Sequence, residues 1–240
     1  MENKTLTESV KSLIGLQLTR EQIAALKAYE TELLKWNERI SLTAIRDAEG
    51  VRIKHFLDSL TVLMAWERHS PPNQLIDVGT GAGFPGLVLK LIWPKTKVTL
   101  VESVHKKADF CRHMVDHLAL EGVTVLSKRA EVVGQHPDHR QSYDLAVARA
   151  VARMPILMEY LLPLVHRNGV VMAMKGESAP AETHSAERAI HILGGRVKKL
   201  VHVELPGVVE ERFIVLVDKV AQTPEKYPRR TGMPAKTPMD

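Results

Sequence analysis

The stretch Leu75–Gly86, LIDVGTGAGFPG, decides the fold. In it an apolar segment runs into a glycine-rich turn, and the residues that follow have the composition of a helix. A strand, a glycine-rich turn and a helix in this order form a phosphate- or nucleoside-binding crevice at the carboxyl end of a parallel strand. Gly81, Gly83 and Gly86 fit the dinucleotide pattern GxGxxG, which is a weak indication by itself.

Two acidic residues distinguish between the cofactors that such a crevice binds. Asp77 stands two positions before Gly79, where a carboxylate pointing at the crevice would repel a pyrophosphate but suit the positively charged methionine part of S-adenosylmethionine. Glu102 ends the next strand-like run, KVTLVE, where a carboxylate can bind two ribose hydroxyls. The alternative is a tight strand-to-helix turn with two incidental acids. The pattern favours S-adenosylmethionine, held by these two acids and by Gly79, Gly81 and Gly83.

The order of the predicted elements indicates an α/β fold. Apolar, strand-like runs occupy residues 74–79, 97–102, 122–126, 143–148, 169–174, 197–204 and 212–217, and helical segments at 84–92, 103–120, 130–135 and 153–167 separate the first five. Such alternation predicts a parallel sheet with helices on both faces. A further helix is expected at 181–193. The short link 205–211 requires the last two strands to be antiparallel. This seven-stranded, mostly parallel sheet with a terminal antiparallel hairpin is the layout of the Rossmann-like class I methyltransferase fold.

Three regions follow from this division. Residues 1–73 form an N-terminal helical extension packed on the core, with expected helices near Leu26–Ile40 and 49–68. Residues 74–219 form the S-adenosylmethionine-dependent methyltransferase domain. Residues 220–240 form a basic, proline-rich C-terminal tail, of which 224–240 should be extended or disordered in isolation. The tail is either a solubilising end or an arm that follows a phosphate backbone.

Composition narrows the setting of the protein. The formal charge of +5 over 240 residues favours polyanionic partners. Cys111 is the only cysteine, which excludes an internal disulfide framework and a cysteine-based metal cluster. The histidines of HPDH (136–139) match no metal motif. The polar start and the short apolar runs argue against secretion and membrane spans. We expect a cytoplasmic, metal-free monomer.

Several local patterns resemble one family when taken together. They are KWN and SLTAI (35–45), KHFLDSL (54–60), DVGTGAGFPG (77–86), VES and KKADF (101–110), RAE (129–131), ARAVA (148–152), MKGE (174–177) and KYPRRTGMPAKTP (226–238). The chain resembles the bacterial 16S ribosomal RNA guanine-N7 methyltransferase G family, also called glucose-inhibited division protein B, over nearly its whole length. One departure is Ser41, at a place where family members usually carry asparagine, so Ser41 is not included in the site.

The resemblance implies methyl transfer from S-adenosylmethionine to nitrogen-7 of one guanine in a hairpin loop of small-subunit rRNA. This nitrogen has a free lone pair at neutral pH, so the reaction needs no general base and depends on proximity, orientation and charge placement. The acceptor could be naked rRNA, the assembled subunit or an intermediate. The alternatives are a methyltransferase for another RNA, a small molecule or a protein, a dinucleotide-dependent oxidoreductase, and a non-catalytic RNA-binding protein.

The resemblance also assigns residues to the cofactor and to catalysis. It places Phe84 in the cofactor site, although Phe84 could equally be a core residue, and Ala130 and Glu131 beside the adenine, although Glu131 could merely cap a short helix. Arg149 and Lys175 end the fourth and fifth strands at the edge where such folds bind ligands. They are the catalytic candidates, Arg149 also contacting the cofactor and Lys175 the RNA. Each could instead be a snorkelling surface cation.

The remaining candidates would bind RNA. Lys106 and Arg129 are raised to functional positions by the resemblance, whereas a charged run such as the one around Lys106 is usually only a solvated face. Arg229 and Arg230 belong to the tail motif KYPRR. His55 of KHFLDSL is either an RNA contact or a structural histidine bonded to the backbone.

Overall fold

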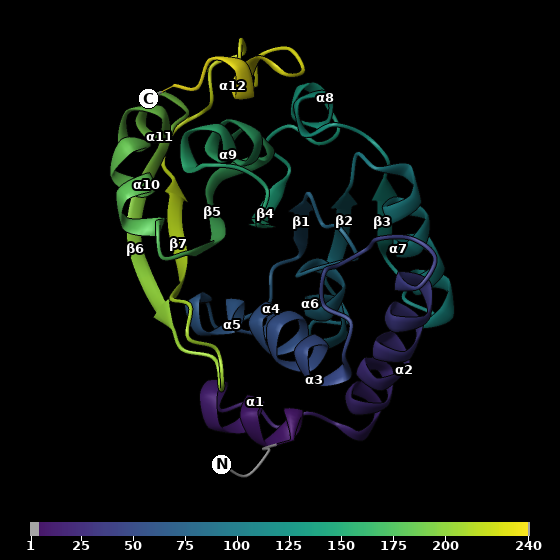
Figure 1. Ribbon diagram of the computed structural model, residues 1–240. Coiled ribbons are helices and arrows are strands. Elements are labelled where there is room, and N and C mark those ends of the chain that lie inside the picture. The colour runs from purple at the N-terminus through teal and green to yellow at the C-terminus, as the bar shows by residue number, and fades with distance from the viewer. Residues whose placement is uncertain (1–4, 240) are drawn as a thin grey trace.

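The computed structural model describes residues 5–239, and a seven-stranded sheet lies at its centre (Figure 1). The strand order is β3-β2-β1-β4-β5-β7-β6. The strands are β1 (Gln74–Val78), β2 (Lys97–Val101), β3 (Val123–Leu126), β4 (Tyr143–Arg149), β5 (Val165–Gly176), β6 (Gly195–Val203) and β7 (Arg212–Lys219). The first five strands pair in parallel, and β7 is antiparallel to both β5 and β6. The predicted sheet and its terminal hairpin are confirmed.

Helices cover both faces of the sheet (Figure 1). One face packs against α1 (Leu6–Ile14), α2 (Arg20–Asn37), α3 (Ala48–Val51), η1 (Arg52–Leu57), α4 (Asp58–Leu60), α5 (Val62–Ala65), α6 (Gly86–Ile92) and α7 (His105–His117). The other packs against α8 (Ala130–Gln135), α9 (Met154–Leu161), η2 (Leu162–Leu164), α10 (Ala179–Ser185) and α11 (Glu187–Ile192). Along residues 5–239, none of the helices combines the length and apolar character needed to cross a membrane.

Three expected helices differ from the prediction. The helix expected at 181–193 is divided into α10 and α11. The helix expected at 49–68 is divided, and its middle, η1, is a π-helix. A π-helical turn has one more residue per hydrogen-bonded ring than an α-helix, which rotates the side chains after it and is frequent at functional sites. The helix expected at 153–167 ends with η2 at Leu164, where Pro163 supplies no backbone N–H, and Val165 already begins β5.

The N-terminal helices are tied to the glycine turn. α2 begins at a capping pair, in which Thr19 accepts from the backbone N–H of Gln22 and the Gln22 side chain accepts from the N–H of Thr19. From the middle of α2, the hydroxyl of the fully buried Tyr29 donates to the carbonyl of Ala82. The first helices therefore support the turn directly.

The C-terminal segment packs on the second face rather than extending away from it. The guanidinium of Arg140 donates hydrogen bonds to the carbonyls of Thr223, Pro224 and Tyr227 at 2.6–3.1 Å. Tyr227 is buried, and the segment ends in the short helix α12 (Met233–Lys236), at the top of Figure 1. The tail is thus ordered because it fills part of the core and satisfies the half-buried Arg140, which a segment in isolation cannot do.

Candidate functional site

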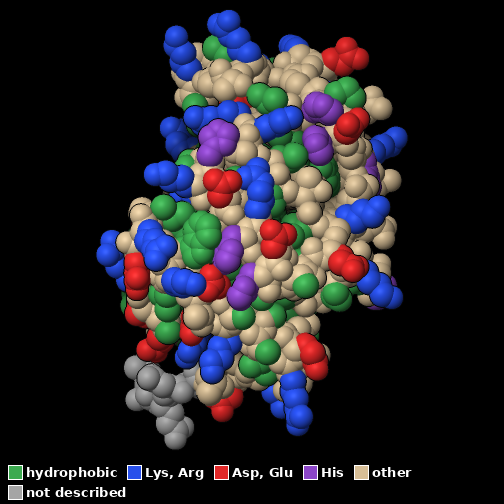
Figure 2. Space-filling view, turned by 90° about the vertical axis from the view of Figure 1, so that its right-hand side faces the viewer, with side chains coloured by type: hydrophobic (Ala, Val, Ile, Leu, Met, Phe, Trp, Pro, Cys, Tyr) green, Lys and Arg blue, Asp and Glu red, His purple; other side chains and the backbone are tan. Residues whose placement is uncertain are grey.

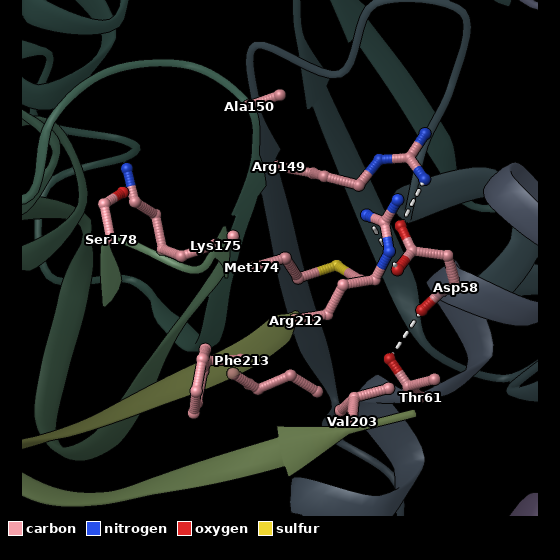
Figure 3. Close-up of a pocket in the computed structure, with 12 residues that line it drawn as sticks. Asp58, Thr61, Arg149, Ala150, Met174, Lys175, Ser178, Val203, Arg212 and Phe213 are labelled. Carbon is pink, nitrogen blue, oxygen red and sulfur yellow. Dashed lines mark hydrogen bonds and ion pairs between the residues drawn. The ribbon is translucent and has the colours of Figure 1, made fainter. Parts of the chain in front are cut away.

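Two cavities lie at the carboxyl ends of the parallel strands. The first, called here the turn cavity, measures about 80 Å³ and is lined by the ends of β1 and β2, by residues 128–131, and by Val151 and Tyr160. The second, the basic pocket, measures about 150 Å³ and is lined mainly by the ends of β4, β5 and β7 and by Asp58 (Figure 3). Residues 149–151 line both cavities, Arg149 and Ala150 on one side and Val151 on the other, so one short loop separates them.

The glycine turn presents bare backbone beside the turn cavity. Gly79, Gly81 and Gly83 have φ angles of +70°, +61° and +94°, a conformation that costs other residues roughly 1 kcal/mol. A Cβ atom at Gly81 would meet nothing within 4 Å, whereas one at Gly83 would meet the Tyr29 hydroxyl. The open side of Gly81 leaves room for a ligand to approach the main chain.

Glu102 holds the turn against the end of β2. Its Oε2 accepts from the N–H of Gly81 at 2.9 Å and its Oε1 from the N–H of Val104 at 2.7 Å. The carboxylate is nearly buried, yet each of its oxygens accepts only one of these bonds. Each oxygen keeps a second lone pair, the kind of acceptor that ribose hydroxyls need.

The sequence suggested that the Asp77 carboxylate points at the crevice. In the structure it lies elsewhere. It is 0% exposed and lines neither cavity. Its Oδ2 accepts from the Thr80 hydroxyl at 2.6 Å and from the N–H of Gly86 at 2.7 Å, which ties the turn to α6. Burial raises the pKa of Asp77 to about 6. Its position beneath the turn corrects the orientation, because the Thr80 hydroxyl and the Gly86 N–H both hold its Oδ2 there.

Phe84 is a core residue in an aromatic stack. Its ring stacks on Tyr29 at 5.3 Å and on His55 at 4.6 Å between centroids. The Arg149 guanidinium lies over the same ring, 5.2 Å from its centre. Phe84 lines neither cavity, so in this structure it supports the site from below.

Arg149 has partners for its charge, as its position at the end of an apolar strand requires. One NH group donates to Asp58 Oδ2 at 2.7 Å and to the carbonyl of Lys54 at 2.9 Å, and the other lies 3.0 Å from His55 Nδ1. All three partners come from η1 and the start of α4. The π-helix therefore presents a carboxylate, a carbonyl and an imidazole to one guanidinium.

His55 is a neutral structural partner in this arrangement. Burial, together with the nearby Arg149, lowers the pKa of His55 to about 3. Since Nδ1 faces an arginine N–H, it must accept, and Nε2 then donates to Thr43 Oγ1 at 2.7 Å. Both ring nitrogens are occupied by side chains, rather than by the backbone contacts considered from the sequence.

Lys175 holds the loop between the two cavities. Its Nζ donates to the carbonyl of Ala152 at 3.0 Å and pairs with Glu182 Oε2 at 2.7 Å. The same Glu182 oxygen accepts from the N–H of Met154 at 2.9 Å. Only 11% of the Lys175 side chain is exposed. Lys175 and Glu182 together fix both ends of the segment 152–154.

The start of α8 forms the far wall of the turn cavity, and the C-terminal segment holds it in place. Glu131 lines the cavity, and its Oε1 accepts from the N–H of Gly232 at 2.8 Å. Ala130 lies next to it in the same wall. Arg229 pairs with the buried Glu159 of α9 at 2.6 Å, so its guanidinium is engaged inside the protein.

The other candidate cations lie on the surface. Lys106, Arg129 and Arg230 are exposed, and Arg129 lines the turn cavity. Figure 2 shows cationic side chains scattered over one face among acidic ones, with histidines between them, and no single continuous basic patch. Within residues 5–239, no group of three or more His, Cys, Asp or Glu side chains is arranged to hold a metal ion.

Sequence reasoning missed Asp58, Glu182 and Arg212. Asp58 is 3% exposed within the apolar face of KHFLDSL, and an acid at such a position was a usable signal. Glu182 carried no such signal in its polar helix. Arg212 begins β7, beside the end of β5, and only the hairpin register brings it to the basic pocket.

The residues that line the turn cavity, together with Gly81 and Glu102 beside it, fit S-adenosylmethionine. The open main chain at Gly81, the free lone pairs of Glu102 and the wall at Ala130 and Glu131 together offer the contacts that a nucleoside needs. When it is bound, S-adenosylmethionine supplies a methyl group that its sulfonium activates for transfer.

Comparisons with known proteins agree with the geometry. Residues 22–213 match the family model GidB, rRNA small subunit methyltransferase G. The chain is 50% identical over 225 residues to "Ribosomal RNA small subunit methyltransferase G" of Roseiflexus sp. (strain RS-1), covering 94% of this chain and 95% of that protein. It is 40% identical to the protein of that name from Alkaliphilus metalliredigens, covering 100% of both chains.

Two solved structures share the fold. A variant of MtNAS in complex with S-adenosylmethionine has a TM-score of 0.54 and 18% identity over 84% of this chain and 73% of that chain. A SAM-dependent O-methyltransferase from Thermotoga maritima has a TM-score of 0.52 and 15% identity, covering 70% of this chain and 66% of that chain. At these identities the likeness concerns the fold alone, and the function rests on the sequence relatives. The chain belongs to the GidB family, rRNA small subunit methyltransferase G.

Proposed function

We propose that the protein transfers the methyl group of S-adenosylmethionine to nitrogen-7 of one guanine in 16S rRNA. The observation that carries the proposal is the pair of adjacent cavities. One has the lining of a nucleoside site, the other is rich in cations, and the consecutive residues 149–151 contribute to both linings. A methyl donor and a base in neighbouring cavities can approach each other within one chain, so the protein acts as a monomer in the cytoplasm.

The cofactor would be bound by the turn. Gly79 and Gly81 offer their main chain, Glu102 accepts from the ribose hydroxyls, and Ala130 and Glu131 flank the adenine. Asp77 and Phe84 contribute from beneath by fixing the turn. Arg149 borders the cofactor from the end of β4.

The chemistry requires alignment rather than proton transfer. Nitrogen-7 attacks through a free lone pair, so a base at the site has no proton to remove. The groups nearest the basic pocket agree with this: His55 has both nitrogens occupied, and Arg149 and Lys175 are paired cations. Their contribution is to position the acceptor and to exclude water.

The RNA would follow the exposed cations around the two cavities. Lys106, Arg129 and Arg230 lie on the surface and are available for phosphates. His55, Lys175 and Arg229 are engaged with protein groups, so we assign them to holding the RNA-facing surface in shape. The three regions 1–73, 74–219 and 220–240 would then act as one unit, since both ends of the chain support the central domain.

The test is methylation of ribosomal particles. Small subunits from a strain lacking this protein are incubated with the protein and cofactor labelled in the methyl group, and the labelled base is mapped. We expect one labelled guanine in 16S rRNA, modified at nitrogen-7. Label on another RNA alone would replace the proposed acceptor, and calorimetric binding of NADH without S-adenosylmethionine would overturn the proposal. A parallel reaction with naked 16S rRNA shows whether the acceptor must be an assembled particle.

A further inference from the structure

One arginine in the basic pocket has an unused donor. Arg212 Nε is buried and has no hydrogen-bond partner among the described residues. Its NH1 lies 3.7 Å from Asp58 Oδ1, longer than a hydrogen bond. Arg149, by contrast, contacts three partners at 2.7–3.0 Å. Figure 3 shows Arg149 and Arg212 converging on Asp58, which contacts both. A buried donor without an acceptor is rare in a folded protein and points to a missing ligand.

The pocket has the size and walls for one base. Its volume of about 150 Å³ resembles that of an apolar cavity known to hold a benzene ring. Met174 and Phe213 supply apolar wall on β5 and β7, next to the cations. An aromatic side chain is a stacking platform for a base that has left its own stack.

Guanine and adenine differ at position 6, where an arginine N–H beside nitrogen-7 would donate a hydrogen bond. Guanine and adenine both offer nitrogen-7, so the reacting atom cannot tell them apart. Beside it, guanine has the acceptor oxygen-6, whereas adenine has the donor N6–H₂. An arginine N–H directed to this position is satisfied by guanine and left facing another donor by adenine.

Resting on the proposed function, we propose that the basic pocket receives the target base and that Arg212 donates a hydrogen bond to oxygen-6, thereby selecting guanine. Asp58 is a positioning residue: it holds Arg149 at 2.7 Å and faces Arg212, which keeps both guanidinium groups on one side of the pocket. Arg149 lines the same pocket beside the loop that leads to the turn cavity, and Arg212 faces the base.

The test combines one change in the enzyme with one in the RNA. Small subunits are reconstituted with 16S rRNA that carries either guanine or 2-aminopurine at the target; 2-aminopurine lacks oxygen-6 but retains nitrogen-7. Wild type, Arg212→Met and the matched control Arg196→Met, an exposed arginine on β6, are compared by kcat/KM. We expect removal of oxygen-6 to lower kcat/KM of wild type and of the control about 10- to 100-fold. With guanine at the target, kcat/KM of Arg212→Met should be lower than that of wild type by a similar factor. Replacing guanine by 2-aminopurine should then cause no further loss in this variant.

Other outcomes would overturn the assignment. If removal of oxygen-6 lowers kcat/KM by the same factor in wild type and in Arg212→Met, then Arg212 does not contact oxygen-6. A uniform loss of RNA affinity with a flatter salt dependence means that Arg212 contacts a phosphate. Melting temperature and S-adenosylmethionine affinity report whether the variant folds, and Arg212→Lys, which keeps the charge near Asp58, provides a second variant if it does not. If wild type methylates no guanine, the proposed function itself fails.

Discussion

Replacing Arg229 and Arg230 separately distinguishes a structural tail from an RNA-binding arm. Glu159 is 0% exposed and accepts from the N–H of Arg229 at 2.8 Å, from its Nε at 2.9 Å and from its NH2 at 2.6 Å. Arg229→Ala removes all three guanidinium bonds to Glu159 and leaves a buried carboxylate with one backbone N–H. Breaking a buried ion pair in this way costs about 3–5 kcal/mol. Arg230 is exposed, and Arg230→Ala should change stability by no more than about 0.5 kcal/mol.

Urea unfolding of the three proteins measures these differences, and calorimetry measures their S-adenosylmethionine affinity. We expect Arg229→Ala to weaken cofactor binding too, because Gly232 would no longer hold Glu131 firmly. The double replacement Glu159→Met with Arg229→Met should recover most of the lost stability, since no charge stays buried. If Arg229→Ala is as stable as Arg230→Ala and both lose RNA affinity equally, the structural assignment of Arg229 is wrong.

Three further changes test other parts of the site. Gly81→Ala and the control Gly207→Ala both have open space and positive φ, so each should lose about 1 kcal/mol of stability, but only Gly81→Ala should weaken S-adenosylmethionine binding, by about tenfold or more in calorimetry. The pKa of His55 is about 3 in the folded protein and about 6.5 in the unfolded chain, so its contribution to stability is complete above pH 6.5 and decreases as the pH falls below that value. Urea unfolding should therefore show that wild type loses up to about 2 kcal/mol more stability than His55→Gln between pH 7 and pH 5. Lys175→Met should lower kcat up to about 100-fold with little change in cofactor affinity, and Glu182→Gln should do the same if Lys175 acts through the loop. If only the Lys175 variant loses kcat, Lys175 contacts the RNA directly. If kcat and cofactor affinity fall equally, Lys175 lies at the cofactor.

The parts of the fold that the sequence predicted well are those determined locally. Strand periodicity, the glycine turn and the short link at 205–211 each depend on residues within a few positions of one another, and the seven strands formed as expected. Glu102 belongs with them because it follows its strand at the edge where nucleosides bind.

Contacts between distant residues could not be predicted in the same way. Arg149 and Asp58 are 91 positions apart, and Arg229 and Glu159 are 70 positions apart. Asp77 shows the same limit at short range. Its position in the motif was clear, but only the folded turn shows that Thr80 and Gly86 both bond one oxygen of its carboxylate, Oδ2.

The tail also has a consequence for when the protein becomes active. Gly232 secures one wall of the turn cavity and Arg229 anchors the segment that carries it, so this wall depends on residues that are synthesised long after the glycine turn. A ribosome that is still translating this chain has made the glycine turn but not the residues that complete the cavity. Under the proposed function, competence to bind the methyl donor should therefore arise only once this segment has been made and has packed against α8 and α9.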